Sequence, residues 1–265
     1  MRKKSLAKWL VAVALAMPAG LAADHVWVAV YAKNTPFKTQ GFESRKYFSE
    51  FATAIQQRWK EGYTLWDLEQ GYHTWMGVFV KGANYTEQGF TSRRDIEKFM
   101  KVVKIRQKQG FYLSDVEWGN GRWVGIFSKG KGLGVQEFVL FEDVEMLPSI
   151  VYSHWKKGMK LEQAVYGDGR WMAVFVKDPA FKDQLVTLSK RYAGLQKDLK
   201  KKWDAGYKVV NLEYGFGYWI AIYDKNAPYT HESVDAINEF DEFNDNMRKR
   251  WKRGYHIIDL ADGKN

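Results

Sequence analysis

An interval of 48 residues recurs along this chain of 265 residues. Three residue types repeat at that interval, five times each: glycine at Gly62, Gly110, Gly158, Gly206 and Gly254, tryptophan at Trp27, Trp75, Trp123, Trp171 and Trp219, and lysine at Lys33, Lys81, Lys129, Lys177 and Lys225. Such a spacing is the sequence signature of a repeat architecture, in which each unit buries its apolar face against the next. The chain must therefore fold as five similar units.

Each unit predicts a helix that ends at the recurring glycine. In the first unit the helix is expected within Phe42–Glu61, because Phe48, Phe51 and Ile55 share one face of a 3.6-residue period. Gly62 then ends the helix, since glycine tolerates the left-handed conformation of a helix C-terminal cap best.

Two strands joined by a tight turn are expected after each glycine. Asn120-Gly121 and Asp168-Gly169 are dipeptides that two-residue hairpin turns prefer. The unit is therefore predicted to be helix–strand–strand, with a connector of about ten residues before the next helix. Pro148 would break a helix interior, so the third helix is expected to begin near it or to bend there.

The two ends of the repeat array predict how the fold closes. The array begins with a second strand, "HVWVAVYAK", and finishes with a first strand, "YHIIDLADG". Pairing of these two strands would complete the fifth hairpin, whereas an open array would leave bare strand edges. The predicted fold class is α+β: a closed five-fold pseudosymmetric ring, resembling a propeller or toroid.

The first 23 residues have the composition of a secretory signal peptide. Four cations precede an apolar run that is shorter than the roughly 20 residues a membrane span requires, and small residues follow it. We therefore expect export to the periplasm or medium, a single ring domain over residues 24–265, and no transmembrane segment in the mature chain. Loss of the four cations lowers the formal net charge from +10 to +6, too small an excess to favour nucleic acid.

Familiar catalytic and metal motifs are missing from the sequence. The chain contains no cysteine, which excludes disulfides, thiolate catalysis and cysteine zinc sites. Its five histidines lack metal-ligand spacing, there is no G-x-S-x-G, and the glycines of Gly130–Gly134 lack the Lys-Ser/Thr continuation of a phosphate-binding loop. We therefore expect no catalytic residues, no metal site and no cofactor.

The stretch "WDAGYKVVNLEYGFGYW", from Trp203 to Trp219, resembles a repeat domain of unknown function. That domain occurs at the C-terminus of plant casein-kinase-like proteins and in uncharacterised bacterial exported proteins. No kinase motif accompanies it, so the resemblance implies a fold module rather than an activity. A five-fold α/β ring is also similar to the penteins, but their hydrolases use a cysteine nucleophile that this chain lacks.

Acidic residues recur at two positions of the predicted first strand. One series is Asp67, Asp115, Asn211 and Asp259, with Gln163 as the odd member, and the other is Glu69, Glu117 and Glu213. Equivalent polar residues in several units favour a role in hydrogen bonding or ion pairing. A pair of carboxylates would alternatively serve glycoside hydrolysis.

Aromatic and lysine side chains provide the candidate ligand-binding residues. Two-residue turns would place three pairs on one hairpin face: Trp118 opposite Trp123, Tyr166 opposite Trp171, and Tyr214 opposite Trp219. These aromatics either pack between hairpin and helix or stay partly exposed and stack on sugar rings or a partner's apolar groups. The five recurring lysines either close strand ends in solvent or form a docking ring for anions.

Taken together, the sequence predicts an exported, non-enzymatic binding or interaction module. Its partner would be a protein or a glycan, and no nucleic acid is expected. The alternative is a carbohydrate-active protein, a lectin or a glycoside hydrolase, that uses the turn-proximal aromatics and the recurrent carboxylates. The sequence implies no particular oligomeric state.

Overall fold

The computed structural model of this protein describes residues 25–130, 133–181 and 183–265. The signal peptide predicted over residues 1–23 lies outside this part of the chain. Within the described residues, no helix combines the length and the apolar character that a membrane crossing requires.

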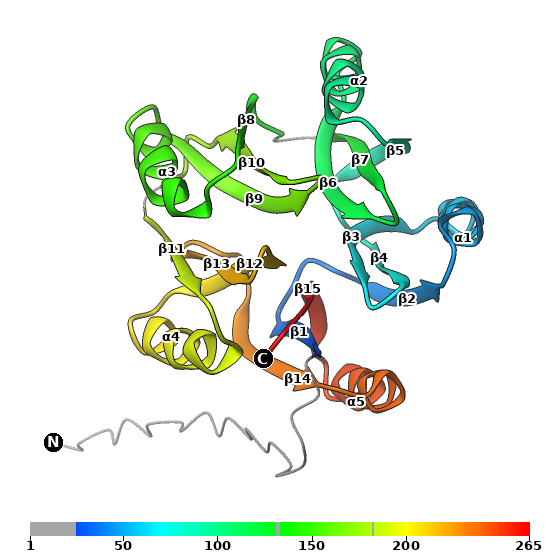
Figure 1. Ribbon diagram of the computed structural model, residues 1–265. Helices are drawn as coiled ribbons and strands as arrows, with labels where there is room; N and C mark the ends of the chain where they lie inside the picture. Colours follow the sequence, from blue (N-terminus) through cyan, green and yellow to red (C-terminus); the bar gives the residue numbers. More distant parts are fainter. Residues whose placement is uncertain (1–24, 131–132, 182) are drawn as a thin grey trace, which may run out of the picture.

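Five small antiparallel sheets and five α-helices make up the described structure (Figure 1). The helices are α1 (Phe48–Lys60), α2 (Ile96–Lys108), α3 (Leu147–Trp155), α4 (Tyr192–Asp204) and α5 (Phe240–Lys252). Each sheet has an outer, a middle and an inner strand. The outer strands are β2 (Thr39–Arg45), β5 (Tyr85–Arg93), β8 (Gln136–Phe141), β11 (Gln184–Ser189) and β14 (Thr230–Ile237). The middle strands are β4 (Thr74–Lys81), β7 (Arg122–Gly130), β10 (Arg170–Lys177), β13 (Tyr218–Asp224) and β1 (Val26–Lys33). The inner strands are β3 (Thr64–Gly71), β6 (Tyr112–Gly119), β9 (Met159–Gly167), β12 (Lys208–Gly215) and β15 (His256–Gly263).

The outer strand corrects the predicted helix–strand–strand unit. The helix of the first unit was expected within Phe42–Glu61, and α1 begins at Phe48, but Thr39–Arg45 is a strand paired with β4 that the sequence did not predict. This strand, with the sequence "TQGFESR", lies at the edge of its sheet and buries little surface, so it contains no run of apolar residues. Gly41 is its one buried residue. The unit is therefore strand–helix–strand–strand.

The helix ends and hairpin turns follow the sequence predictions. The five recurring glycines all have positive φ, and after α1 the Tyr63 N–H donates to the Arg58 carbonyl, as in a Schellman cap. Pro148 lies in the first turn of α3, where its missing N–H costs nothing. Asn120 and Gly121 both have positive φ, as a type I′ turn demands.

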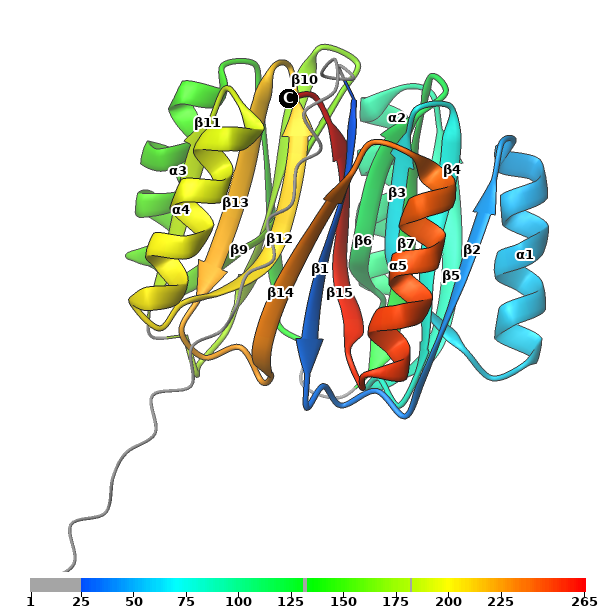
Figure 2. The same cartoon turned by 90° about the horizontal axis from the view of Figure 1, so that it is seen from below.

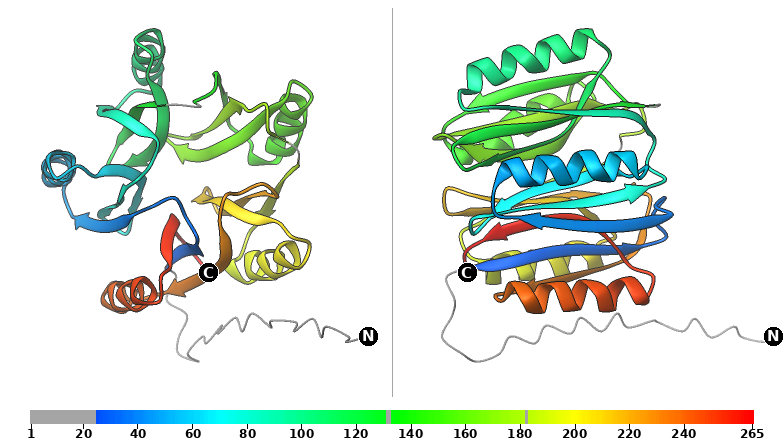
Figure 3. Two further views of the ribbon diagram at one scale, coloured as in Figure 1. Left: turned by 180° about the vertical axis from the view of Figure 1, so that it is seen from behind. Right: turned by 90° about the vertical axis from the view of Figure 1, so that its right-hand side faces the viewer.

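The five sheets lie around a common centre, with the inner strands toward it and the helices outside (Figure 1). Each inner strand contacts the inner strands of two other units, in the order β3, β6, β9, β12, β15 and back to β3. Figure 2 shows strands and helices running lengthwise from one end of the molecule to the other. From behind, the helices again occupy the periphery (Figure 3). The inner strands thus converge along one axis.

The first and last strands of the described chain belong to one sheet. β1 pairs with β15 along its length, from Val26 opposite Gly263 to Ala32 opposite His256. It also pairs with β14 on its other edge. The pairing predicted from the two chain ends is therefore present, and it gives the fifth unit the same three strands as the others.

Close approach between units depends on a glycine at the end of each inner strand. A Cβ atom built on any of these glycines would lie 2.0 to 2.4 Å from a side chain of the preceding unit: Gly71, Gly119, Gly167, Gly215 and Gly263. For Gly167 the obstructing atom is Cγ of Trp118, and for Gly71 it belongs to Asp262, so the contact also joins the last unit to the first. Distances this short leave room for hydrogen only.

Gly167→Ala is expected to destabilise the protein by about 3 kcal/mol, because the new methyl group overlaps the packed indole of Trp118. Urea unfolding of the variant beside the parent protein measures the effect. Gly89→Ala is the matched control, since a Cβ at this strand glycine finds its nearest neighbour at 4.0 Å. Equal stability of the two variants would contradict the close-contact account.

Candidate functional site

Each inner strand contains a β-bulge at the same repeat position. The register with the middle strand shifts by one residue, for example between Leu65 and Asp67 in β3 and between Leu113 and Asp115 in β6. Corresponding shifts occur in the other units. The extra residues are Trp66, Ser114, Glu162, Val210 and Ile258. Bulges redirect side chains at a sheet edge, and here they do so where five edges converge.

The recurrent acids and amides next to these bulges bridge neighbouring units. Asp115 Oδ2 accepts a hydrogen bond of 2.6 Å from the Leu68 N–H of the preceding inner strand. The Val116 N–H donates to Gln163 Oε1 at 3.1 Å. In the same way, the Leu212 N–H donates to Asp259 Oδ2 at 2.7 Å. These side chains satisfy backbone donors on strand edges that have no further strand to pair with.

A second series of side chains bridges the units from the outer strands. Gln184 Oε1 accepts hydrogen bonds from the Leu161 N–H (2.9 Å) and the Trp155 indole (3.1 Å), while its amide donates to the Leu161 carbonyl (2.8 Å). Equivalent contacts are made by Gln40, Gln88 and Gln136, although Gln136 has no tryptophan partner. The residue at this position in the fifth unit is Glu232. The series anchors the inner strands just before their bulges.

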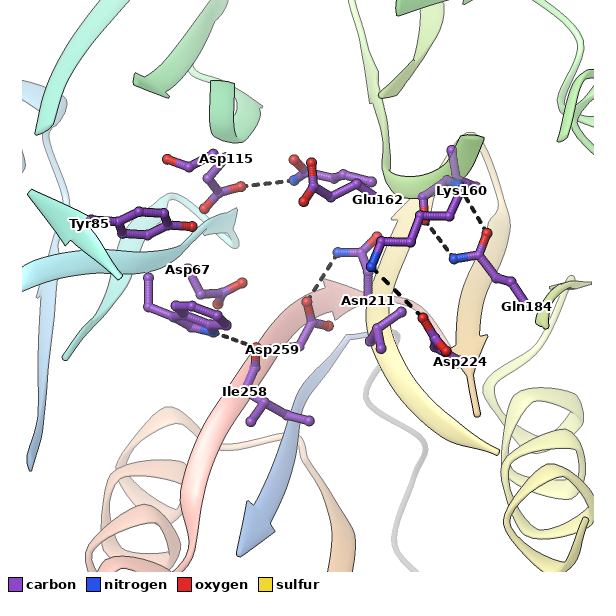
Figure 4. Close-up of a pocket in the computed structure, with 15 residues that line it drawn as sticks. Asp67, Tyr85, Asp115, Lys160, Glu162, Gln184, Asn211, Asp224, Ile258 and Asp259 are labelled. Atoms are coloured by element: carbon purple, nitrogen blue, oxygen red, sulfur yellow. Dashed lines mark hydrogen bonds and ion pairs between the residues drawn. The ribbon is translucent and has the colours of Figure 1, made fainter. Parts of the chain in front are cut away.

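A pocket of about 170 Å³ lies among the bulges and receives residues from all five inner strands (Figure 4). Trp66 and Tyr85 form one wall, with ring centroids 6.3 Å apart in a stacked arrangement. Its remaining lining is mostly polar, and its acidic members are Asp67, Asp115, Glu162, Asp224 and Asp259. Lys160, which lies 3.0 Å from Asp178 and 3.9 Å from Asp224, is the one lysine or arginine among the described lining residues.

Burial dominates the protonation of these acids. It raises the pKa of Asp115 to about 7, although hydrogen bonds from Gln163 and from backbone amides oppose the rise. Burial also raises the pKa of Glu162, against hydrogen bonds from Tyr112 and Gln136. The pKa values of Asp67 and Asp259 rise for the same main reason, with repulsion from neighbouring carboxylates adding to it. A cation in the pocket would favour the charged forms of these groups.

The second acidic series forms a separate group adjacent to the pocket lining. Glu69, Glu117 and Glu213 are buried, and each offers a carboxylate oxygen within 4.8 Å of the other two. Among the described residues this is the one histidine or carboxylate cluster compact enough to hold a metal ion. Burial raises all three pKa values well above the ordinary range, and repulsion from neighbouring carboxylates, which for Glu213 are Asp259 and Asp115, adds to it.

The comparisons with known proteins add one finding. A family model described as a domain of unknown function, DUF7477, matches residues 99–265, from within α2 to the end of the chain. The match covers more than half of the sequence. The chain belongs to this family. Searches among curated proteins and among solved structures each found no match.

The predicted aromatic pairs form, but the tryptophan that each pair has on its middle strand is buried. Trp118 faces Trp123, Tyr166 faces Trp171, and Tyr214 faces Trp219, with ring centroids 5.1 to 5.2 Å apart. Trp123, Trp171 and Trp219 are 0% exposed; Trp123 and Trp219 contact aromatic rings of α2 and α4, and Trp171 stacks on Phe141 of β8. Their partners are half-buried, and Trp118 and Tyr166 lie against Gly167 and Gly215 of the next unit. All six rings thus contribute to packing within or between units.

The recurring lysines lie at the end of the molecule opposite the hairpin turns, near the helix C-termini. In four units the ammonium group stands 4.4 to 4.6 Å from the aromatic ring that follows the capping glycine: Lys33 over Tyr255, Lys81 over Tyr63, Lys129 over Phe111, and Lys225 over Tyr207. Lys177 instead donates to the Lys157 carbonyl at the end of α3. These contacts favour a capping role, because cations at helix C-termini are stabilising.

Sequence reasoning missed the residues that make the pocket asymmetric. Glu162 and Asp224 are each the one acidic residue at a repeat position that is otherwise apolar or neutral, and Lys160 shares its position with Lys208. The sequence signal that could have found these pocket residues is a difference from the equivalent residues of the other units, whereas the residues that recur stabilise the fold. The same applies to Glu232, where the other units have glutamine.

Glu232 should make stability depend on pH. Burial raises its pKa to about 8 from an ordinary value of 4.5, against hydrogen bonds from the Val209 backbone and Trp203. Because the pKa of this acid rises on folding, its contribution to the free energy of unfolding is fully present below pH 4.5. That contribution is lost as the pH rises through 8. The Tyr229 hydroxyl meanwhile donates to the Val209 carbonyl, a bond that glutamine makes in other units.

Between pH 5 and 8 the free energy of unfolding of the parent protein is expected to fall by up to about 4 kcal/mol as Glu232 ionises. Glu232→Gln should abolish this fall, because a neutral amide does not ionise. Unfolding free energies of variant and parent across this range provide the measurement. Gln88→Glu makes the reverse exchange at the equivalent position, and it should make the free energy of unfolding fall more steeply as the pH rises. Parallel pH profiles for parent and Glu232→Gln would show that burial does not control this group.

Proposed function

We propose that this protein is an exported, non-enzymatic binding module: a closed ring of five α/β units that holds its ligand in the axial pocket. The cyclic order of contacts among the inner strands and the pairing of β1 with β15 support ring closure. Export rests on the signal peptide predicted over residues 1–23 and is tested by the mature N-terminus, expected near Asp24.

The composition of the pocket supports a small, polar and positively charged ligand. Five acidic side chains line it against Lys160, and that lysine already pairs with Asp178 and Asp224. Trp66 and Tyr85 add an aromatic wall, which attracts cations through the ring faces. An amine bound here would face carboxylates whose charged forms are otherwise disfavoured by burial.

The bonding of the recurrent acids argues against hydrolysis. Asp115 accepts hydrogen bonds from both the Leu68 amide and the Gln163 side chain, and Asp259 accepts them from Leu212 and Asn211. A carboxylate occupied in this way is oriented by the fold rather than free to exchange a proton with substrate. These residues therefore serve the scaffold that shapes the pocket.

A carbohydrate-active function is the second candidate, and Glu162 is the observation that favours it. This acid occurs in one unit only, lines the pocket, and has a raised pKa beside Asp115. A carboxylic acid kept neutral by burial is the type of group that protonates a glycosidic oxygen. Sugar rings would stack on Trp66 and Tyr85.

The resemblance of this chain to the C-terminal repeat domain of plant casein-kinase-like proteins is a prediction from the sequence, and we include it in this proposal. It is consistent with a fold module that supplies binding to different proteins. Membership of a family described only as a domain of unknown function leaves the ligand to be decided by the pocket chemistry.

Calorimetric titration with matched amines and neutral sugars tests the ligand class. Glucosamine, putrescine and agmatine are expected to bind, and glucose and N-acetylglucosamine are not, because only the amines offset the acidic lining. Glu162→Gln should weaken amine binding at least tenfold, since it removes one carboxylate at little change in shape.

Glu97→Gln is the control, because Glu97 is exposed on α2 and does not line the pocket. Equal binding of amines by the Glu162 variant and the parent would exclude the pocket as the binding site. Binding of neutral sugars in preference to amines, or their hydrolysis, would favour the carbohydrate-active candidate instead.

A further inference from the structure

Three buried glutamates form a cluster where the inner strands converge, and one of their carboxylate oxygens has no hydrogen-bond partner. Glu69, Glu117 and Glu213 come from three different units, at the same repeat position of β3, β6 and β12. They are 4% to 6% exposed, and each offers an oxygen within 4.8 Å of the others. Oxygen Oε2 of Glu117 has no hydrogen-bond partner, although its exposed area is negligible.

A buried, unpaired carboxylate oxygen is costly, so its surroundings must compensate for it. No lysine, arginine or histidine of the described residues forms an ion pair with any of the three. Among the described residues, no cationic side chain therefore balances the charge of these carboxylates when they are ionised.

We propose that Glu69, Glu117 and Glu213 bind one calcium ion on the ring axis. Carboxylate oxygens are the ligands of hard cations, and the absence of sulfur or imidazole donors in the cluster disfavours zinc. Calcium–oxygen distances of about 2.3–2.6 Å let two ligand oxygens lie nearly 5 Å apart across the ion. Oxygens within 4.8 Å of one another are compatible with that span, and calcium also tolerates an irregular ligand set better than magnesium, which requires a strict octahedron.

Such an ion would connect the first, second and fourth units through their inner strands. It would also relieve the repulsion among three carboxylates held close together in a dry environment. The other two units have Val165 and Ala261 at this position, so the site has ligands on only three of five sides, and water completes the coordination. This site is distinct from the amine pocket, which none of the three glutamates lines.

The test is calorimetric titration of CaCl₂ into protein that has been treated with EDTA, at pH 8, combined with thermal unfolding. One calcium ion is expected per chain, with a melting temperature that rises as calcium is added. Magnesium should bind at least tenfold more weakly. Absence of both heat and a thermal shift up to about 10 mM calcium would overturn the proposal.

Glu117→Gln removes one charge at nearly constant shape and is expected to weaken calcium binding at least tenfold. Its own melting temperature without calcium should equal or exceed that of the parent, because repulsion among the carboxylates decreases; this measurement also shows that the variant folds. Glu97→Gln, on the exposed face of α2, should bind calcium like the parent.

Glu162→Gln separates this proposal from the function proposed for the pocket. It is expected to weaken amine binding and leave calcium affinity within about threefold of the parent, because Glu162 is not a member of the glutamate cluster. Calcium binding that persists unchanged in Glu117→Gln would overturn the assignment of the site. Failure of amine binding alone would leave the calcium result standing.

Discussion

Pairing of β1 with β15 is the interaction on which this fold depends. Each of the other four sheets is built from consecutive residues of the chain, but the fifth needs a middle strand from the beginning of the described chain and its two neighbours from the end. Without it, β14 and β15 would lose their shared partner and expose two unpaired edges. The contact of Gly71 with Asp262 would be lost at the same junction. The proposed closure of the ring therefore rests on one strand.

The axis of the molecule combines two opposed requirements. Five inner strands present edges that lack a further strand, so side chains of adjacent units supply the missing hydrogen bonds, as Asp115 does for Leu68. Satisfying those edges concentrates carboxylates in a buried region, which raises their pKa values. The amine binding proposed for the pocket rests on this concentration of carboxylates.

Sequence alone predicted the repeat, the helix ends, the hairpin turns and the pairing of the terminal strands, because each depends on local chemistry at a fixed interval. The outer strands were missed, since a segment such as Thr39–Arg45 is short, polar and stabilised by strand pairing rather than by pattern. Trp123 and its equivalents were open to two interpretations because periodicity does not distinguish a core face from a binding face. Glu162 and Asp224 were missed because each is acidic in one unit only, whereas periodicity marks the residues that recur.

Disulfide crosslinking between the terminal strands tests ring closure most directly. The chain has no cysteine, so Ala32→Cys with His256→Cys creates a unique pair at facing positions of β1 and β15. Thr64→Cys with Val80→Cys is the equivalent pair in the first hairpin and serves as the positive control. The account predicts an intramolecular disulfide in both proteins, and stabilisation by about 4 kcal/mol for the terminal pair, whose closed loop spans most of the chain. A control pair that forms while the terminal pair stays reduced, or links separate molecules, would contradict the closed ring.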